Sequence, residues 1–256
     1  MRFSVITINR NNAEGLERTI KSIIIQQREL YEFIIIDGAS TDDSVNIIKK
    51  YQSYIRYYIS EPDKGIYHAM NKGIAQAQGE YAIFINSGDE FSYANALYDV
   101  NNRSKLSTDF IFCGWIRAKS YTKKVYCLPA PKLTLYKMLY KSYCVCHQAT
   151  FTKISVLKEL QGYDEEMKIS SDICFLMKSL VIHNKSYETL PFHITYFDIT
   201  GISGSNAGTK IIKEEKPKYF KQTFPYIYDD YIRLHNILRF TPTNIIKFIK
   251  WKLSID

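Results

Sequence analysis

Apolar positions in the first ninety residues follow two different periods. Three short, nearly continuous apolar runs have the pattern of strands buried on both faces of a sheet: 3–8, 33–36 and 81–85. Between the first two runs, residues 11–27 place four apolar side chains along one face of a helix: Leu16, Ile20, Ile23 and Ile24. Strands that alternate with amphipathic helices favour an α/β fold, with a mostly parallel central sheet flanked by helices.

Capping residues indicate where two of the helices begin. Asn11 and Glu14 have the spacing of a capping box at the start of residues 11–27. Thr41 or Asp42 is placed to cap the next helix. The apolar face of that second helix is formed by Val45, Ile48 and Tyr51.

Polar residues stand at or near the end of each predicted strand. Thr7 and Asn9 end the first strand, Asp37 follows the second, and Asp89 follows the third. Because the carboxyl ends of parallel strands meet at one edge of a sheet, and ligands bind there in open α/β folds, we expect these residues to share a site. That edge is the predicted nucleotide site.

The acidic turn after the third strand is Asn86-Ser87-Gly88-Asp89-Glu90. Carboxylates bind hard cations such as Mg²⁺ and Mn²⁺, and a cation at this edge would face a diphosphate. Asp89 and Glu90 are therefore the first candidates for metal ligands. The alternative is a polar turn that an acidic residue caps.

Several segments together resemble one known family, the family 2 inverting glycosyltransferases of the GT-A fold. The most similar members are bacterial enzymes that build O-antigen, capsule or exopolysaccharide. The matching segments are Thr-Ile-Asn-Arg-Asn-Asn at 7–12, Ile-Asp-Gly-Ala-Ser-Thr-Asp at 36–42, Glu-Pro-Asp-Lys-Gly-Ile-Tyr-His-Ala-Met-Asn-Lys-Gly at 61–73, Asn-Ser-Gly-Asp at 86–89, His-Gln-Ala-Thr-Phe at 147–151, Gly-Tyr-Asp-Glu at 162–165 and Ile-Ser-Ser-Asp at 169–172. The resemblance implies a Rossmann-like catalytic domain over residues 1–205. Residues 206–256 form a separate C-terminal extension without a specific resemblance.

The resemblance implies a nucleoside-diphosphate sugar as the donor. Asp37 matches the position that contacts the base, and a carboxylate accepts the imide N–H of uracil, which cytosine lacks, so a UDP-sugar is favoured. Asp63, just before a helix expected near Gly65, matches a position close to the ribose and base, or serves as a charge at the helix N-terminus. The full set expected to bind the donor is Thr7, Asn9, Asp37, Asp63, Lys64, Asn71, Ser87 and Gly88. Lys72 is a weaker candidate beside the phosphates.

Asp89 is the expected ligand of Mn²⁺ or Mg²⁺. Relatives usually place two or three aspartates in this turn. Asn86 therefore removes one negative charge, and it should weaken metal binding or leave more of the coordination to the diphosphate oxygens.

An inverting transfer needs one base to deprotonate the acceptor hydroxyl. Asp172 matches the family's base position, at the start of a helix expected over 172–180, and its alternative role is that of an N-terminal cap. We expect partial burial under an acceptor to raise its pKa. His147 and Gln148 are expected to contact the sugars, the alternative for His147 being a hydrogen-bonded core residue.

Composition is consistent with a reduced, intracellular enzyme. The chain has 256 residues, of which 46% are hydrophobic, enough for one sizeable core. Its five cysteines are odd in number and lack a Cys-x-x-Cys spacing, so neither a disulfide framework nor a zinc site is indicated. The first strand begins at residue 3 and no apolar run reaches 18 residues, so we expect neither a signal peptide nor a membrane span. The expected location is the cytoplasm, either free or on the inner face of the cytoplasmic membrane.

Residues 201–208 are rich in glycine and serine, and they form either a lid that closes over the donor or a plain linker. After them, residues 210–256 carry ten Lys or Arg against five acidic residues, a net charge of +5 out of +8 for the whole chain. Aromatic residues are interleaved with these charges. A helix expected over 243–253 would either lie on an anionic membrane, where a lipid-linked (undecaprenyl-diphosphate) acceptor is found, or pack on the catalytic domain. No motif supports nucleic-acid binding.

Two classes of function fit the sequence. The first is an inverting, non-processive glycosyltransferase with a saccharide acceptor, and the second is a catalytically inactive module on the same fold that binds a nucleotide sugar or a glycan. A dinucleotide-dependent oxidoreductase is excluded because no Gly-x-Gly-x-x-Gly follows the first strand. A processive synthase is disfavoured because the chain lacks both membrane spans and a Gln-x-x-Arg-Trp motif.

Overall fold

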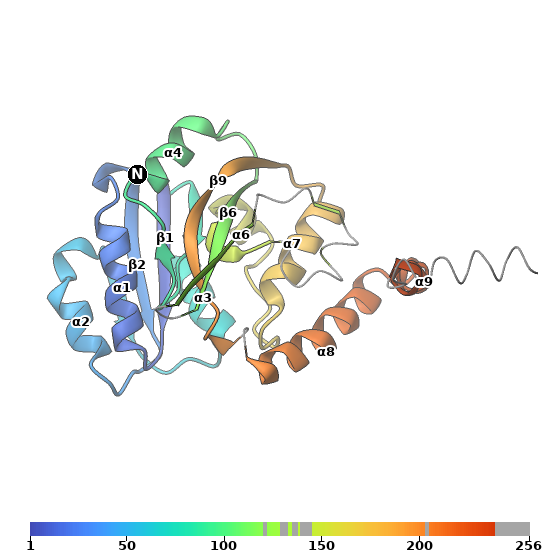
Figure 1. The fold of residues 1–256 in the computed structure, drawn as a ribbon, viewed down its shortest axis with the longest axis horizontal. Coiled ribbons are helices and arrows are strands. Elements are labelled where there is room, and N and C mark those ends of the chain that lie inside the picture. Colours follow the sequence, from blue (N-terminus) through green and yellow to red (C-terminus); the bar gives the residue numbers. More distant parts are fainter. Residues whose placement is uncertain (120–121, 129–132, 135–137, 139–144, 203–204, 239–256) are drawn as a thin grey trace, which may run out of the picture.

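Figure 1 shows the protein as a computed structural model, which describes residues 1–119, 122–128, 133–134, 138, 145–202 and 205–238. The helix expected over 243–253 lies outside the described residues, as does Cys144. None of the helices in these ranges combines the length and the hydropathy that a membrane span requires.

Within the described residues, nine strands form one mixed sheet with the order β3-β2-β1-β4-β8-β6-β9-β5, and β7 pairs with β6. The strands are β1 (Phe3–Asn9), β2 (Tyr31–Asp37), β3 (Tyr57–Ser60), β4 (Tyr81–Phe84), β5 (Glu90–Phe91), β6 (Phe110–Lys119), β7 (Thr122–Leu128), β8 (Thr150–Lys153) and β9 (Tyr187–Asp198). The first four in the order are parallel. β8 is antiparallel to both β4 and β6, β9 is parallel to β6, and β5 returns antiparallel along β9.

Helices cover both faces of the sheet. One face is covered by α1 (Ala13–Ile24), α2 (Ser44–Lys50) and α4 (Ala96–Arg103). The other is covered by α3 (Ile66–Gln76), α6 (Ile154–Glu159) and α7 (Ser171–Val181). In Figure 1, α8 (Asn206–Thr223) runs below α7 toward the right, where α9 (Tyr228–Leu238) follows it. Three single turns of 3₁₀-helix join these elements: η1 (Arg28–Leu30), η2 (Gln52–Tyr54) and η3 (His147–Ala149).

Side chains of the central strands alternate between two hydrophobic clusters. Phe33 and Ile35 of β2 pack in the cluster under α1, whereas Ile34 and Ile36 pack in the cluster under α3. Because both faces are covered, four successive positions of β2, Phe33 to Ile36, carry apolar side chains, and the buried polar residues Glu32 and Asp37 flank this run. Coverage of both faces explains the continuous apolar runs and confirms the predicted α/β fold class.

The predicted capping box at Asn11 is wrong. The N-cap of α1 is Asn12, whose side chain accepts a hydrogen bond from Gly15 N. Asn11 instead has a φ of +50° and its Oδ1 accepts from Thr41 N at 2.8 Å. Asp42 accepts from both Ala13 N (2.8 Å) and Ser44 N (3.0 Å), so its carboxylate joins the starts of α1 and α2.

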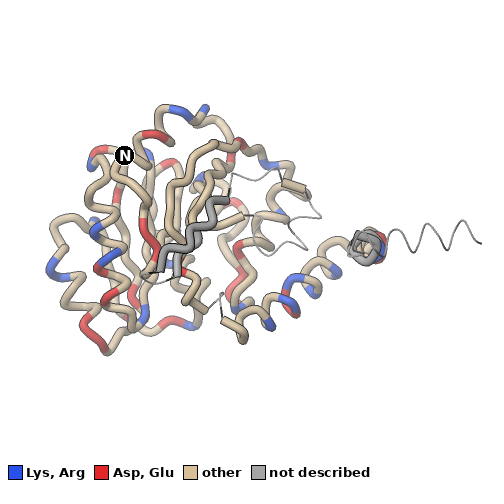
Figure 2. Tube along the Cα trace, in the orientation of Figure 1, with Lys and Arg blue, Asp and Glu red and all other residues tan. Residues whose placement is uncertain are grey.

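The first helix of the extension packs on the catalytic part. Phe220 and Phe224 are buried in the same cluster as α7. Glu215 accepts hydrogen bonds from three consecutive backbone N–H groups just before α7, those of Lys168 (2.6 Å), Ile169 (3.1 Å) and Ser170 (3.0 Å). Figure 2 shows Lys and Arg residues distributed along α8. α8 therefore packs on the catalytic domain, and the two alternatives for residues 243–253 stay predictions.

Candidate active site

A cavity of about 800 Å³ opens at the carboxyl ends of β1, β4 and β9. Its rim over these strands is formed by Asn9, Arg10, Asn86, Ser87, Asp198 and Thr200. The remaining walls come from η3, the N-terminal turns of α3 and α7, and one side of α8. The cavity therefore lies at the sheet edge that the sequence pattern indicated.

Asp89 is buried at the base of this cavity, with 4% of its surface exposed. Its Oδ2 accepts a hydrogen bond from Gln148 Nε2 at 2.8 Å, and its Oδ1 accepts one from Asp198 N at 2.9 Å. Burial raises the pKa of Asp89 to about 6, and these two hydrogen bonds only partly offset that rise. Both hydrogen bonds to the Asp89 carboxylate come from neutral donors, a side-chain amide and a backbone N–H.

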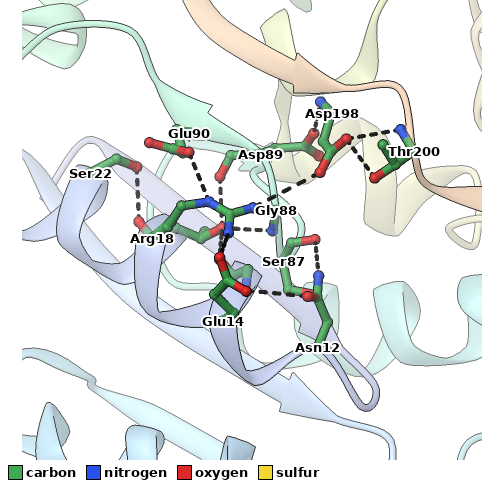
Figure 3. Close-up of polar contacts among 12 residues, drawn as sticks. Asn12, Glu14, Arg18, Ser22, Ser87, Gly88, Asp89, Glu90, Asp198 and Thr200 are labelled. Atoms are coloured by element: carbon green, nitrogen blue, oxygen red, sulfur yellow. Dashed lines mark hydrogen bonds and ion pairs between the residues drawn. The ribbon is translucent and has the colours of Figure 1, made fainter. Parts of the chain in front are cut away.

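Asp198 lies beside Asp89 because β5 returns antiparallel to β9 directly after the acidic turn. Figure 3 shows its carboxylate between Thr200 and Arg18. Its Oδ1 accepts from Thr200 N (2.8 Å) and Oγ1 (2.7 Å), and its Oδ2 lies 4.0 Å from Arg18 Nη2. Gly88 has a φ of +104°, and a Cβ there would lie 3.2 Å from Asp198 Oδ2. The glycine therefore serves both the turn conformation and the approach of this carboxylate.

Asp172 occupies the first turn of α7. Its carboxylate contacts two side chains, His147 and Tyr67, and His147 in turn contacts Asn86. His147 Nδ1 lies 3.1 Å from Asp172 Oδ2, and His147 Nε2 lies 3.1 Å from Asn86 Nδ2. In this arrangement Nδ1–H donates to the carboxylate and Nε2 accepts from the amide. The hydroxyl of Tyr67 lies 3.1 Å from Asp172 Oδ1 and also contacts the carbonyl of Ile169.

The pKa of Asp172 shifts in the direction opposite to our expectation. Burial by itself would raise it, but hydrogen bonds from His147, from the backbone N–H of Ile173 and from the hydroxyl of Tyr67 hold the pKa below its usual value. Asp172 is therefore ionised at neutral pH.

The comparisons with known proteins agree on one family. The model of glycosyl transferase family 2 matches residues 4–154, more than half of the chain. The chain belongs to glycosyl transferase family 2. It is 34% identical over 204 residues to an uncharacterized glycosyltransferase of Mycobacterium tuberculosis, covering 78% of this chain and 76% of the relative. It is 30% identical over 219 residues to the poly(ribitol-phosphate) beta-N-acetylglucosaminyltransferase TarP of Staphylococcus aureus, covering 80% of this chain and 65% of that protein.

Solved structures confirm the GT-A fold for this family 2 member. Residues 1–349 of Staphylococcus aureus TarS in complex with UDP-GlcNAc superpose with a TM-score of 0.62 at 18% identity, covering 87% of this chain and 73% of the other. The mannosyltransferase PcManGT of Pyrobaculum calidifontis, in complex with GDP-Man and Mn²⁺, gives 0.65 at 14% identity, covering 100% and 81%. The family match makes the protein a glycosyltransferase.

The family 2 resemblance and the strand pattern together named twelve site residues, and the cavity contains seven of them: Asn9, Asp63, Ser87, Asp89, His147, Gln148 and Asp172. His147 is partly exposed there. Gln148 is buried, and its Oε1 accepts from Cys146 Sγ (2.8 Å) while its Nε2 donates to Asp89. Both ends of the Gln148 amide thus bind protein groups, so the structure does not leave it directed at a sugar.

Asp37 and Thr7 do not line the cavity. Asp37 is fully buried and accepts hydrogen bonds from Asn9 Nδ2, from the amide and hydroxyl of Ser40, and from the hydroxyl of Ser60. These bonds tie three neighbouring strand ends together, and the contact of Asp37 with a base stays a prediction. Thr7 is one step deeper in β1, where its hydroxyl donates to the carbonyl of Ile85 at 2.6 Å.

The remaining three expected donor residues also lie outside the cavity lining. Asn71 holds the turn before α7, because its amide bonds to both the N–H and the carbonyl of Tyr163. Lys64, two residues before α3, is exposed. Gly88 packs closely against the carboxylate of Asp198. Lys72 pairs with Asp63 and Glu61, each at 2.7 Å, and is not among the residues that line the cavity.

Several cavity residues were missed by the sequence analysis: Arg10, Tyr67, Trp115, Asp198, Lys213 and Lys216. For Asp198 a signal existed, since Tyr196-Phe197 ends in an acid as the apolar runs before Asp37 and Asp89 do. Of the predicted loop, Gly201 and Ile202 line the cavity, and residues 203–204 lie outside the described ones.

The residues present fit a divalent cation. Asp89 and Asp198 supply adjacent carboxylates, and Asn86 Oδ1 is buried without a hydrogen-bond partner among the described residues. The described part of the chain contains no cluster of three or more His, Cys, Asp or Glu side chains with metal-binding geometry. Any cation here would therefore need further oxygen ligands from a diphosphate. Glu90 is not one of these candidates, because it pairs with Arg18 at 3.3 Å and does not line the cavity.

The raised pKa of Asp89 predicts an unusual dependence of stability on pH. Between its unfolded value of 3.8 and its folded value of about 6, the native state binds a proton that the unfolded state has released, so stability falls as pH rises. With metal removed by a chelator, the wild type should lose about 2 kcal/mol between pH 4.5 and 7.5 relative to Asp89→Asn. Urea unfolding at both pH values measures this, with the exposed Asp229→Asn as the control. Parallel pH curves for wild type and Asp89→Asn would contradict the assigned burial.

Proposed function

We propose that this glycosyltransferase is inverting and non-processive, and that it transfers a sugar from a UDP-sugar to a saccharide acceptor in bacterial surface-polysaccharide biosynthesis, of the O-antigen, capsule or exopolysaccharide type. The observation that carries the proposal is the ionised carboxylate of Asp172 at a cavity that also contains Asp89. One base and one separate metal-binding acid are what a direct displacement requires.

In this proposal Asp172 accepts the proton of the acceptor hydroxyl as that oxygen attacks the anomeric carbon. His147 orients the carboxylate, and Asn86 in turn orients His147 through its amide. Attack from the side opposite the leaving nucleoside diphosphate inverts the anomeric configuration. Because no second carboxylate acts as a nucleophile, no covalent sugar intermediate forms.

Asp89 and Asp198 would hold Mn²⁺ or Mg²⁺, with the donor diphosphate completing the coordination. When bound, the cation neutralises charge that develops on the leaving diphosphate. The complexes of TarS with UDP-GlcNAc and of PcManGT with GDP-Man and Mn²⁺ support a nucleoside-diphosphate donor and a metal. The second hypothesis remains a catalytically inactive module that binds a nucleotide sugar or a glycan. It is supported by Asn86, which stands where the family resemblance implies an aspartate.

The acceptor is proposed to be a surface glycan, either lipid-linked through undecaprenyl diphosphate or part of a phosphate-containing polymer. TarP, a relative by sequence, acts on poly(ribitol-phosphate) according to its name. The residues after 205 are proposed as a C-terminal unit that brings the enzyme to the anionic inner face of the cytoplasmic membrane, since their excess of basic and aromatic residues favours such a surface.

A thermal-stability screen tests the donor and the metal together. UDP with Mn²⁺ should raise the melting temperature by several degrees, because a ligand at a hundred times its Kd stabilises by about 2.7 kcal/mol, and GDP, dTDP and CMP should do less. In Asp89→Ala the Mn²⁺-dependent part should disappear, whereas Glu90→Ala should keep it. A Mn²⁺ effect that persists in Asp89→Ala would move the metal site elsewhere.

The base is tested by the slow hydrolysis of a radiolabelled UDP-sugar. Asp172→Asn preserves the shape of the side chain but removes its ability to accept a proton, so turnover should fall about 100-fold or more while the Kd for UDP stays within twofold. Asp164→Asn, in the turn before α7 and outside the cavity lining, is the matched control. Turnover of Asp172→Asn within a few-fold of wild type would exclude Asp172 as the base.

Membrane association is tested by sedimentation with vesicles. The full chain should bind vesicles that contain anionic lipid at low salt and bind neutral vesicles weakly, since each basic residue near the surface contributes about 1 kcal/mol. If aromatic residues insert into the bilayer, a fraction of the protein should stay bound to the vesicles at high salt. Recovery of all protein in the supernatant under every condition would refute the membrane role.

A further inference from the structure

A carboxylate of α8 holds the backbone that leads into α7. Glu215 accepts hydrogen bonds from three successive backbone N–H groups, those of Lys168 (2.6 Å), Ile169 (3.1 Å) and Ser170 (3.0 Å). Successive backbone N–H groups form a concave site for an anion, and here a side chain 45 to 47 residues further along the chain supplies that anion. Hydrogen bonds to a carboxylate are stronger than those between neutral groups, so this contact fixes segment 168–170 against α8.

Tyr67 holds the same segment from its other side. Its hydroxyl donates to the carbonyl of Ile169 and also lies 3.1 Å from Asp172 Oδ1. The backbone of Ile169 is thus bound through its N–H by Glu215 and through its carbonyl by Tyr67. A phenol has a single proton to donate. The place of the Ile169 carbonyl therefore determines how Tyr67 shares that proton between the backbone and the carboxylate of Asp172.

The helix that carries Asp172 begins where this segment ends. Ser170 is the N-cap of α7, and its carbonyl accepts a hydrogen bond from Cys174 N at 3.0 Å, which opens the helix. Asp172 follows two residues later, and its side chain is 25% exposed at the cavity. Glu215 is not among the residues that line the cavity, and none of its hydrogen bonds reaches Asp172 directly. Any effect of Glu215 on the reaction must therefore pass through the backbone of 168–170.

We propose that Glu215 is a positioning residue for the sugar transfer. By fixing the backbone at 168–170, it holds the carboxylate of Asp172 where the acceptor hydroxyl is deprotonated. The inference rests on the proposed function, in which Asp172 is the base. A displacement of about 1 Å at a reacting group can cost about 100-fold in rate. The first helix of the C-terminal extension thus contributes to turnover as well as to the core that it shares with α7.

Hydrolysis of radiolabelled UDP-GlcNAc by the full chain with Mn²⁺ tests the role of Glu215. Glu215→Gln keeps the shape of the side chain, but it removes the charge and replaces one acceptor oxygen by an NH₂ group. We expect kcat to fall about tenfold or more, while the KM for UDP-GlcNAc changes by less than about twofold. Glu214→Gln removes the same charge from the exposed neighbouring position of α8, and it should leave kcat within about twofold of wild type.

The same substitution in an Asp172→Asn background separates positioning from a loss of structure. Once residue 172 cannot accept a proton, its placement matters little, so Glu215→Gln should lower the remaining turnover by less than about twofold. Hydrogen exchange of the backbone amides of 168–170 should become faster in Glu215→Gln, because their acceptor is weakened. If Glu215→Gln does not fold, Glu215→Asp, which keeps the charge and shortens the side chain by one methylene, is measured in both backgrounds instead.

Three results would overturn the positioning role. The first is a kcat of Glu215→Gln within twofold of wild type. The second is an equal fold-loss in the wild-type and Asp172→Asn backgrounds, which would assign Glu215 to stability alone. The third is an effect confined to KM, which would assign it to donor binding. Failure of the proposed function is distinguishable, because the wild type would then show neither hydrolysis of UDP-GlcNAc nor stabilisation by UDP, or Asp172→Asn would keep wild-type turnover.

Discussion

Two carboxylates, the buried Asp89 and the partly buried Asp172, are the constraint on which this end of the molecule depends. A buried carboxylate is stable only when its oxygens accept hydrogen bonds or face a cation. Two adjacent residues of η3 meet this requirement, since His147 faces Asp172 and Gln148 donates to Asp89. A single turn of 3₁₀-helix thereby connects the strand edge to the start of α7. The cavity lies between the strand edge, η3 and the start of α7.

The two acids differ because their partners differ. Asp89 accepts from an amide and from the N–H of Asp198, and the second carboxylate nearby raises the pKa of Asp89 further than burial does alone. Asp172 faces an imidazole and a helix N–H, which hold its pKa below the usual value despite its burial. Environment therefore moves the pKa values of two chemically identical groups in opposite directions.

The C-terminal helix α8 belongs physically to the catalytic unit. Its aromatic residues Phe220 and Phe224 share a core with α7, and Glu215 secures the backbone that leads to Asp172. A change in the position of α8 would therefore act on the segment before Asp172 through three hydrogen bonds. Hydrogen bonds thus join α8, the first helix of the basic C-terminal extension, to the segment directly before Asp172.

The sequence by itself determined the α/β class, the edge at which the site lies, and the presence there of Asp89, His147 and Asp172. These conclusions depend on the local period of apolar residues and on the order of short motifs, which are properties of neighbouring positions. Gly88 and its acidic turn belong to the same category, because a turn after a buried strand is a local event.

Only the tertiary structure decided which polar groups reach the cavity. Asp37 and Asp89 both follow a buried apolar strand. Pairing of β2 with β1 and β3 brings Asn9 and Ser60 against the Asp37 carboxylate, which lies outside the cavity lining. Asp198 entered the site because β9 pairs with β5, more than a hundred residues earlier in the chain, and α8 entered it by packing on α7. Such pairings depend on contacts between distant segments. No local sequence pattern predicts these strand pairings, because the burial of apolar surface that stabilises them occurs only when the whole core is assembled.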